Sequence, residues 1–208
     1  MTSERRIRIL RAADRPAAGW KNGGGVTREI AAFPPGAGMD DFGWRISLAE
    51  VTADGPFSVF PGVDRTLTLA EGAGMDLEIG DLENGGVRDL VDRRYEPRRF
   101  PGDEPTACRL LAGPVVNFNV MYRRGAVTAD TAVVRGDLAL TVRPGETLLV
   151  IALEGSAEIE GADEFEGAAG LGPYDALLAT GSQELLLRTS GRAAVVRLGH
   201  GSGGAQPV

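Results

Sequence analysis

The stretch that decides the fold is Pro61–Gly72, which reads PGVDRTLTLAEG. A Pro-Gly turn signal precedes a mostly apolar run and a Glu-Gly pair ends it, as expected for a β-strand between two turns. The same pattern recurs 83 residues later at Pro144–Gly155, which reads PGETLLVIALEG. Two matched turn–strand–turn units in one chain predict two similar β-barrel halves.

Strand signals extend outward from these two units in both directions. Turn residues recur roughly every 8–12 positions and helical periodicity is nearly absent, which is typical of an all-β sandwich or barrel. Residues 81–107 are the least regular, and we expect short extended pieces and loops there. The further strands that we expect are residues 6–10, 26–33, 42–51, 57–60, 75–79, 115–122, 126–135, 138–142, 157–160, 176–180, 184–189 and 193–198.

The sequence therefore predicts an all-β chain made of two antiparallel β-sandwich barrels. We expect the first half to span residues 1–124, the second half residues 125–200, and a Gly-rich flexible tail residues 201–208. A chain of 208 residues is long enough to bury a substantial core in this arrangement.

Composition and charge exclude several classes of function. The net charge of −7 is the wrong sign for a protein that binds nucleic acid. No stretch approaches the ~18 apolar residues of a membrane span, and residues 1–6 lack a signal-peptide pattern, so we expect a cytoplasmic protein without a membrane partner. Cys108 is the only cysteine, which rules out an internal disulfide. No histidine lies near it, so we expect a buried structural thiol and not a nucleophile.

A second informative stretch is Trp20–Ile30, which reads WKNGGGVTREI. Three consecutive glycines rule out a helix and indicate a backbone that needs positive φ or close approach. Lys21, the only lysine of the chain, stands directly before them with Trp20 and Asn22. This composition fits a ligand-binding turn and a hairpin loop with solvated charges equally well.

Four blocks in order resemble the signature of the HutD/Ves family. They read WKNGGGVTREI at residues 20–30, FGWRISLA at 42–49, GPFSVFPGVDR at 55–65 and GPVVNFNVM at 113–121. The second half is similar only in its strand pattern and its Glu-Gly turn. The resemblance implies a bicupin of the RmlC-like cupin superfamily, a link to histidine utilisation, and binding of a pathway intermediate such as formylglutamate.

Metal-binding cupins typically carry two histidines close together on one strand, then a glutamate and a third histidine. This chain has one histidine, His200, in its Gly-rich tail. The two repeated strands carry no ligand residue, and no Asp/Glu cluster has suitable spacing for a hard cation. We therefore predict that the protein uses no metal and no cofactor.

Polar residues alternate along three of the expected strands. If these strands line one barrel, their polar faces point inward, where unpartnered polar groups are costly and a small carboxylate would satisfy them. Trp20 would cover this ligand, Lys21 or Asn22 would contact it, and Gly24 would let its backbone approach. The candidate ligand-binding residues are Trp20, Lys21, Asn22, Gly24, Thr27, Arg45, Ser47, Arg65, Asn117 and Asn119.

Three functions remain open from the residues. The first is a metal-free bicupin that binds a small anionic metabolite in a regulatory or accessory role. The second is a cofactor-independent enzyme on the same site, with Lys21, Glu29 or Tyr122 in catalysis but no assigned catalytic set. The third is a structural β-protein without ligand, in which Arg45 and Arg65 form internal salt bridges. Apolar strand surfaces are also compatible with a homodimer.

Overall fold

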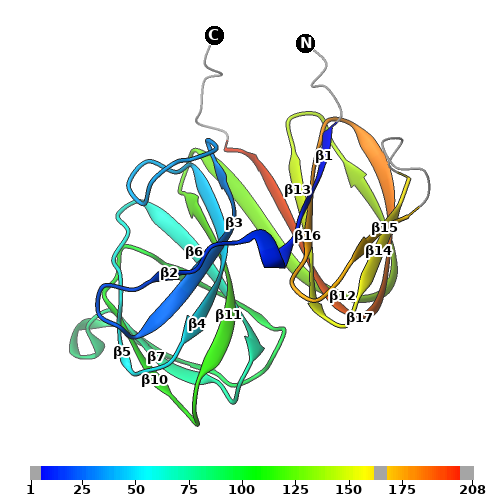
Figure 1. Cartoon of the computed structure of the whole chain (residues 1–208). Coiled ribbons are helices and arrows are strands. Elements are labelled where there is room, and N and C mark those ends of the chain that lie inside the picture. The colour runs from blue at the N-terminus through cyan, green and yellow to red at the C-terminus, as the bar shows by residue number, and fades with distance from the viewer. Residues whose placement is uncertain (1–5, 162–167, 202–208) are drawn as a thin grey trace. The chain divides into compact units, whose positions relative to one another are not determined.

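The computed structural model describes residues 6–161 and 168–201 (Figure 1). In these ranges the chain forms β-strands and two short 3-10 turns, η1 (Ala12–Asp14) and η2 (Leu82–Asn84), with no α-helix. None of these helical turns has the length to cross a lipid bilayer. The chain divides into two compact units: residues 16–124, called the first barrel here, and residues 1–15 with 125–208, called the second barrel.

The first barrel consists of two antiparallel sheets (Figure 1). The larger sheet has the order β2 (Ala18–Gly19), β3 (Gly25–Phe33), β4 (Trp44–Val51), β11 (Val115–Arg123), β6 (Val63–Glu71) and β9 (Pro97–Pro101). The smaller sheet has the order β5 (Gly55–Phe57), β10 (Thr106–Leu110), β7 (Met75–Ile79) and β8 (Val87–Val91). Leu67 and Leu69 from the larger sheet share one buried cluster with Met75 and Leu77 from the smaller. The two sheets therefore enclose a common core.

The second barrel is built on one large antiparallel sheet. Its order is β1 (Arg6–Leu10), β16 (Ala176–Thr180), β13 (Thr147–Glu154), β17 (Gln183–His200), β14 (Ala157–Glu160) and β15 (Ala169–Leu171), and β12 (Val127–Val142) also pairs with β17. Its buried core consists of aliphatic side chains, among them Leu148, Val150 and Val195.

The first strand of the chain lies in the second barrel, whereas we predicted residues 1–124 as the first half. β1 pairs with β16, with Ile7 opposite Ala179 and Ile9 opposite Leu177. Ile7 and Ile9 also pack against the core of the second barrel. Burial of these two side chains and completion of the β16 ladder account for the placement. Of the predicted tail, Gly201 donates its N–H to Ala126 O at 2.9 Å, and residues 202–208 lie outside the described ranges.

In two places, a pair of strands that we predicted as separate forms one continuous strand in the structure. Residues 126–135 and 138–142 join in β12, and residues 184–189 and 193–198 join in β17. The register between these strands shifts at Val134/Gly136. Gly136, with φ of 72°, therefore marks a bulge inside a long strand and not a strand end.

The internal repeat of the sequence is also a structural repeat. Tyr95 N donates to Leu69 O at 2.8 Å, and Tyr174 N donates to Ala152 O at 2.7 Å. Both tyrosines have positive φ, 68° and 63°. Leu69 and Ala152 are separated by the same 83 residues as the two sequence units. β6 and β13 are therefore equivalent strands of the two barrels.

Candidate ligand-binding site

A band of polar residues crosses three neighbouring strands of the first barrel. Met121 of β11 lies opposite Arg45 of β4 and Arg65 of β6, and Asn119 lies opposite Ser47 in the next row. Residues directly opposite each other in antiparallel strands share one face of the sheet. Four of the predicted site residues therefore lie on a single face.

This face is the inner face of the barrel. Asn117 lies opposite Leu69, and Asn119 lies opposite Leu67. Both leucines are fully buried members of the core that the two sheets share. The polar band is thus built into the wall of the hydrophobic core, and Asn117 joins the other four residues there.

Arg65 is a buried cation without an anionic partner in the described residues. Its residue exposure is 8%, and its Nε is buried with no hydrogen-bond acceptor. The guanidinium carbon lies 5.1 Å from the ring centre of Phe57, 5.0 Å from that of Phe100 and 6.0 Å from that of Phe60. Burial lowers the pKa of Arg65 to about 10, so it stays charged at neutral pH. The rings attract the cation but offer no hydrogen-bond acceptor in its plane.

Arg45, by contrast, has a carboxylate partner. Its Nε donates to Glu29 Oε2 at 2.8 Å, and the Glu29 side chain is about half-exposed. The alternative of an internal salt bridge therefore holds for Arg45. For Arg65 it does not, because neighbouring Asp64 pairs with Arg124 at 2.6 Å.

The two asparagines of the band also have unused hydrogen-bonding capacity. Asn117 is fully buried and Asn119 is 5% exposed, and the Oδ1 atoms of both are buried without a donor in the described part of the chain. Asn117 Nδ2 has a long contact to Met75 Sδ at 3.9 Å. Buried amide oxygens are normally satisfied by protein, water or ligand donors. The inner wall therefore offers one cation and two acceptors to a polar group.

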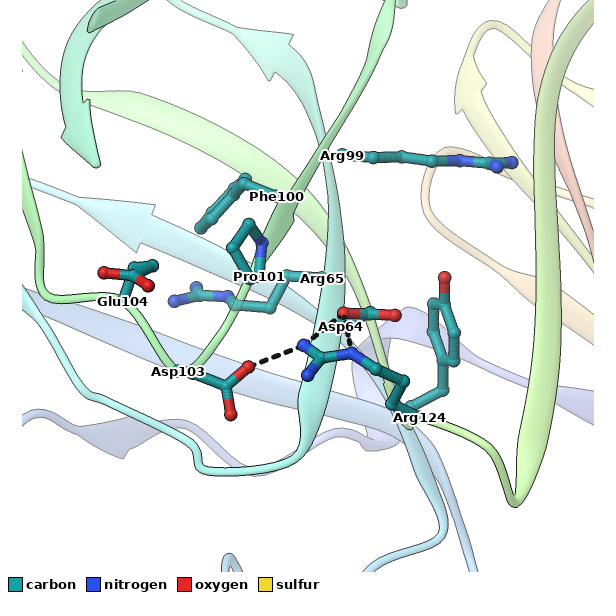
Figure 2. Close-up of a pocket in the computed structure, with 9 residues that line it drawn as sticks. Asp64, Arg65, Arg99, Phe100, Pro101, Asp103, Glu104 and Arg124 are labelled. Carbon is teal, nitrogen blue, oxygen red and sulfur yellow. Dashed lines mark hydrogen bonds and ion pairs between the residues drawn. The ribbon is translucent and has the colours of Figure 1, made fainter. Parts of the chain in front are cut away.

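An open cavity of about 500 Å³ lies at the surface end of the first barrel where β6 begins and β9 ends (Figure 2). Its size is suitable for a small metabolite. Arg65 is the predicted site residue that lines it. The lining residues are Asp64, Arg65, Arg99, Phe100, Pro101, Asp103, Glu104, Tyr122 and Arg124.

Sequence reasoning missed the aromatic residues around Arg65 and the charged residues of this cavity. Phe57 and Phe60 belong to the GPFSVFPG block, where alternation indicated only a short extended piece. Phe100 and Glu104 lie in residues 81–107, which gave no regular pattern. No local signal brings Phe100 to Arg65, because the two meet through the pairing of β6 with β9.

The glycine turn contributes one aromatic side chain to the barrel. Trp20 Nε1 donates to Thr27 Oγ1 at 2.7 Å, and the Trp20 ring contacts Phe57 edge-on with a centroid distance of 6.2 Å. Phe57 in turn lies against Arg65. Trp20 and Thr27 are thus connected to the Arg65 environment through one phenyl ring.

The other predicted residues of the turn lie away from Arg45. Gly25 pairs with Val51, whereas Arg45 is six residues earlier on the same β4 strand, about 20 Å along it. Lys21 and Asn22 are exposed, and Asn22 Oδ1 accepts from Gly24 N at 3.1 Å. The expected cover of Lys21, Asn22 and Gly24 over the arginines is not formed, because antiparallel pairing sets the start of β3 against the end of β4.

The structure gives little support to catalysis by the residues that we considered. Lys21 is exposed, whereas an amine nucleophile needs burial. Tyr122 lines the cavity with Arg65 but lies on the face of β11 opposite to Asn119, and Glu29 is engaged by Arg45. Cys108 is buried 3.6 Å from Met75 Sδ, and burial raises the pKa of its thiol to about 11. Residues 6–161 and 168–201 contain no group of three or more His, Cys, Asp or Glu side chains arranged to hold a metal.

Comparison with known proteins places the chain in a family. The model of the HutD family matches residues 12–196. A protein of Pseudomonas putida, described as an uncharacterized 21.2 kDa protein in the hutC 3' region, is 34% identical over 193 residues, which cover 92% of this chain and 97% of that protein.

Solved structures agree with this family and extend the likeness in fold to a protein of very different sequence. HutD from Pseudomonas fluorescens SBW25, solved in a formate condition, is 31% identical with a TM-score of 0.80 over 94% of this chain and 99% of that one. An oxalate decarboxylase mutant from Bacillus subtilis has a TM-score of 0.64 over 96% of this chain and 78% of that one. At 8% identity this last likeness shows the all-β cupin-type fold alone. By its sequence and its fold, this chain belongs to the HutD family.

Proposed function

We propose that the first barrel binds a small carboxylated metabolite beside Arg65, in a regulatory or accessory role connected with histidine utilisation. The observation that carries this proposal is the unpaired, buried guanidinium at the wall of a cavity of about 500 Å³. A buried charge without a partner is costly for folding. An arriving carboxylate would form charge-assisted hydrogen bonds with it, each of which contributes about 1.5–3 kcal/mol.

The second barrel provides an internal comparison. The residue 83 positions after Arg65 is Leu148, which is fully buried in an aliphatic core. In the same way, Asn119 lies opposite Leu67 in the first barrel, and Val195 lies opposite Val150 in the second. The fold therefore accommodates apolar side chains at these positions. This comparison supports a role in ligand binding for the polar residues of the first barrel.

The connection with histidine utilisation rests on the relatives. The Pseudomonas putida protein is named for its place beside hutC, and the solved relative is a HutD. Formylglutamate, an intermediate of that pathway, is one carboxylated metabolite of suitable size. Regulation or storage by binding requires no catalytic residues.

The test is ligand-dependent thermal stability of the wild type and Arg65→Met. Formate, L-glutamate and N-formyl-L-glutamate are titrated into both proteins. A ligand at 100 times its Kd stabilises the folded state by about 2.7 kcal/mol, which raises the melting temperature. We expect this shift in the wild type and at least a tenfold loss of affinity in Arg65→Met.

The matched control is Arg93→Gln, which changes an arginine of the same barrel with a 77% exposed side chain. It should bind like the wild type. Absence of any shift in the wild type, or equal binding by Arg65→Met, would overturn the proposal. Conversion of a ligand during incubation, followed by NMR, would instead indicate the cofactor-independent enzyme.

A further inference from the structure

We infer that the cavity beside Arg65 takes a zwitterionic amino acid, whose carboxylate binds Arg65 and whose ammonium group binds Glu104. This inference rests on the proposed function, because it needs a ligand at Arg65. It adds the chemical class of that ligand: a free amino group is required, and an N-acylated acid such as formylglutamate is disfavoured.

The charges that line the cavity leave two groups unpaired. Arg124 binds Asp64 at 2.6 Å and Asp103 at 2.5 Å, so these three side chains neutralise one another in part. Arg99 is engaged in contacts of its own. Among the described residues, neither the buried Arg65 guanidinium nor the carboxylate of Glu104, which is an exposed residue, has a hydrogen bond or an ion pair. One cation and one anion thus remain available to a ligand.

The two unpaired groups are held at one side of the cavity. In Figure 2 the Arg65 side chain extends past Pro101 toward Glu104, and both line the same cavity. The backbone of Glu104 is fixed by the hydrogen bond from Thr106 Oγ1 to its carbonyl at 3.1 Å. Its carboxylate lies over Gly80, where Oε2 is 3.2 Å from the position that a Cβ would take. The absence of a side chain at Gly80 therefore leaves room for the Glu104 carboxylate.

The rings around Arg65 leave its N–H groups available to an anion. Phe57 and Phe100 lie about equally far from the guanidinium carbon, at 5.1 and 5.0 Å. Rings at this distance attract the cation but accept no hydrogen bond from its N–H groups, which remain for an anion. A planar carboxylate matches the edge of a guanidinium with two parallel hydrogen bonds. Arg65 is thus suited to the carboxylate end of a ligand.

Charge balance decides between an amino acid and its N-acylated form. The cavity is lined by three arginines and three carboxylates, which sum to no net charge. A monocarboxylate without an amino group adds a negative charge beside Asp64, Asp103 and Glu104, and it covers Glu104 without pairing it. An ammonium group beside the carboxylate pairs Glu104 and restores the balance. Because Glu104 is exposed in the unliganded protein, the preference for a free amino group comes from its pairing with Glu104 and from the charge balance.

The experiment compares L-glutamate with N-formyl-L-glutamate by isothermal titration calorimetry on the full chain. The two ligands share their carbon skeleton and carboxylates and differ in the amino group. We expect the wild type to bind L-glutamate at least tenfold more tightly. Glu104→Gln should weaken L-glutamate at least tenfold and leave N-formyl-L-glutamate unchanged or tighter.

Glu184→Gln, which changes an exposed glutamate of the second barrel, is the control and should behave like the wild type. Equal or tighter binding of N-formyl-L-glutamate by the wild type would overturn the inference and leave the proposed function standing. The inference also fails, and the proposed function stands, if Glu104→Gln changes the affinity for both ligands equally or for neither. If no ligand binds, and Arg65→Met changes nothing, the proposed function and the inference both fail.

Discussion

Arg45 and Arg65 flank Met121 on the inner face of the same sheet, yet in the described part of the chain only Arg45 has a carboxylate partner. Two strand spacings, about 10 Å, separate their backbones. The difference comes from the neighbouring strands. β3 brings Glu29 to Arg45, whereas β9 brings Phe100 to Arg65. Arginine is therefore part of an internal ion pair at position 45 and a cation without a carboxylate partner at position 65.

Replacement of Arg65 by methionine should stabilise the unliganded protein while it removes ligand binding. The substitution removes a buried, unpaired charge, and the equivalent position of the second barrel is Leu148. We expect the free energy of unfolding, measured by urea denaturation, to rise by about 1–2 kcal/mol. The loss of the three contacts between Arg65 and the aromatic rings reduces this gain. Arg93→Gln should change it by less than about 0.5 kcal/mol. A loss of stability in Arg65→Met would show that the rings already satisfy the cation.

Removal of Glu29 should cost more stability than removal of Arg45. Glu29→Ala leaves a guanidinium that is 10% exposed without its acceptor, at a cost of about 1–3 kcal/mol. Arg45→Met leaves Glu29, which is 42% exposed and can be hydrated, at a cost below about 1 kcal/mol. Chemical denaturation of both single variants and the double variant measures their coupling. Equal costs would mean that the Arg45 guanidinium, like the Glu29 carboxylate, becomes hydrated when its partner is removed.

Asp175 should give the second barrel a pH-dependent contribution to stability. Burial raises the pKa of Asp175, but hydrogen bonds from Ala12 N, the Arg11 guanidinium and Gly172 N together lower it below its usual value. Because the folded-state pKa lies below the unfolded value of about 3.9, the contribution is present above pH ~4. It is lost as the pH falls through the folded-state pKa.

The measurement for Asp175 is urea unfolding of the wild type and Asp175→Asn at pH 7 and pH 3. The wild type should be more stable than the variant at pH 7, and the difference should shrink at pH 3. Asp137→Asn, at a 68% exposed side chain of the same barrel, is the control. A stability difference that is the same at both pH values would contradict the assignment.

Two of the three consecutive glycines, Gly24 and Gly25, should differ in their tolerance of alanine. A Cβ at Gly25 would lie 2.4 Å from Glu50 O and 3.2 Å from the Trp20 ring, so Gly25→Ala should cost about 2–4 kcal/mol. A Cβ at Gly24 meets only the Asn22 side chain, at 3.4 Å or more, and Gly24→Ala should cost less than about 1 kcal/mol. Thermal unfolding of both variants measures the difference. Equal tolerance would show that the turn adjusts without strain.

The sequence was sufficient for the fold class and for most strands. Alternation and turn residues placed β7, β14 and β16 at their observed bounds, and the 83-residue repeat marked equivalent strands. The strands predicted at residues 126–135 and 138–142 are one strand, because Gly136 between them forms a bulge and not a turn. The barrel that β1 joins was also missed, since strand pairing between distant segments leaves no local pattern.

For the candidate site, strand periodicity by itself determined which side chains share a face: Arg45 with Ser47, and Asn117 with Asn119. Only the tertiary structure decided which of them have partners. Glu29 reaches Arg45, the Phe57 and Phe100 rings lie against Arg65, and Glu104 lines the same cavity as Arg65. The period of a strand is a property of adjacent residues, whereas the satisfaction of a buried charge depends on every strand packed around it.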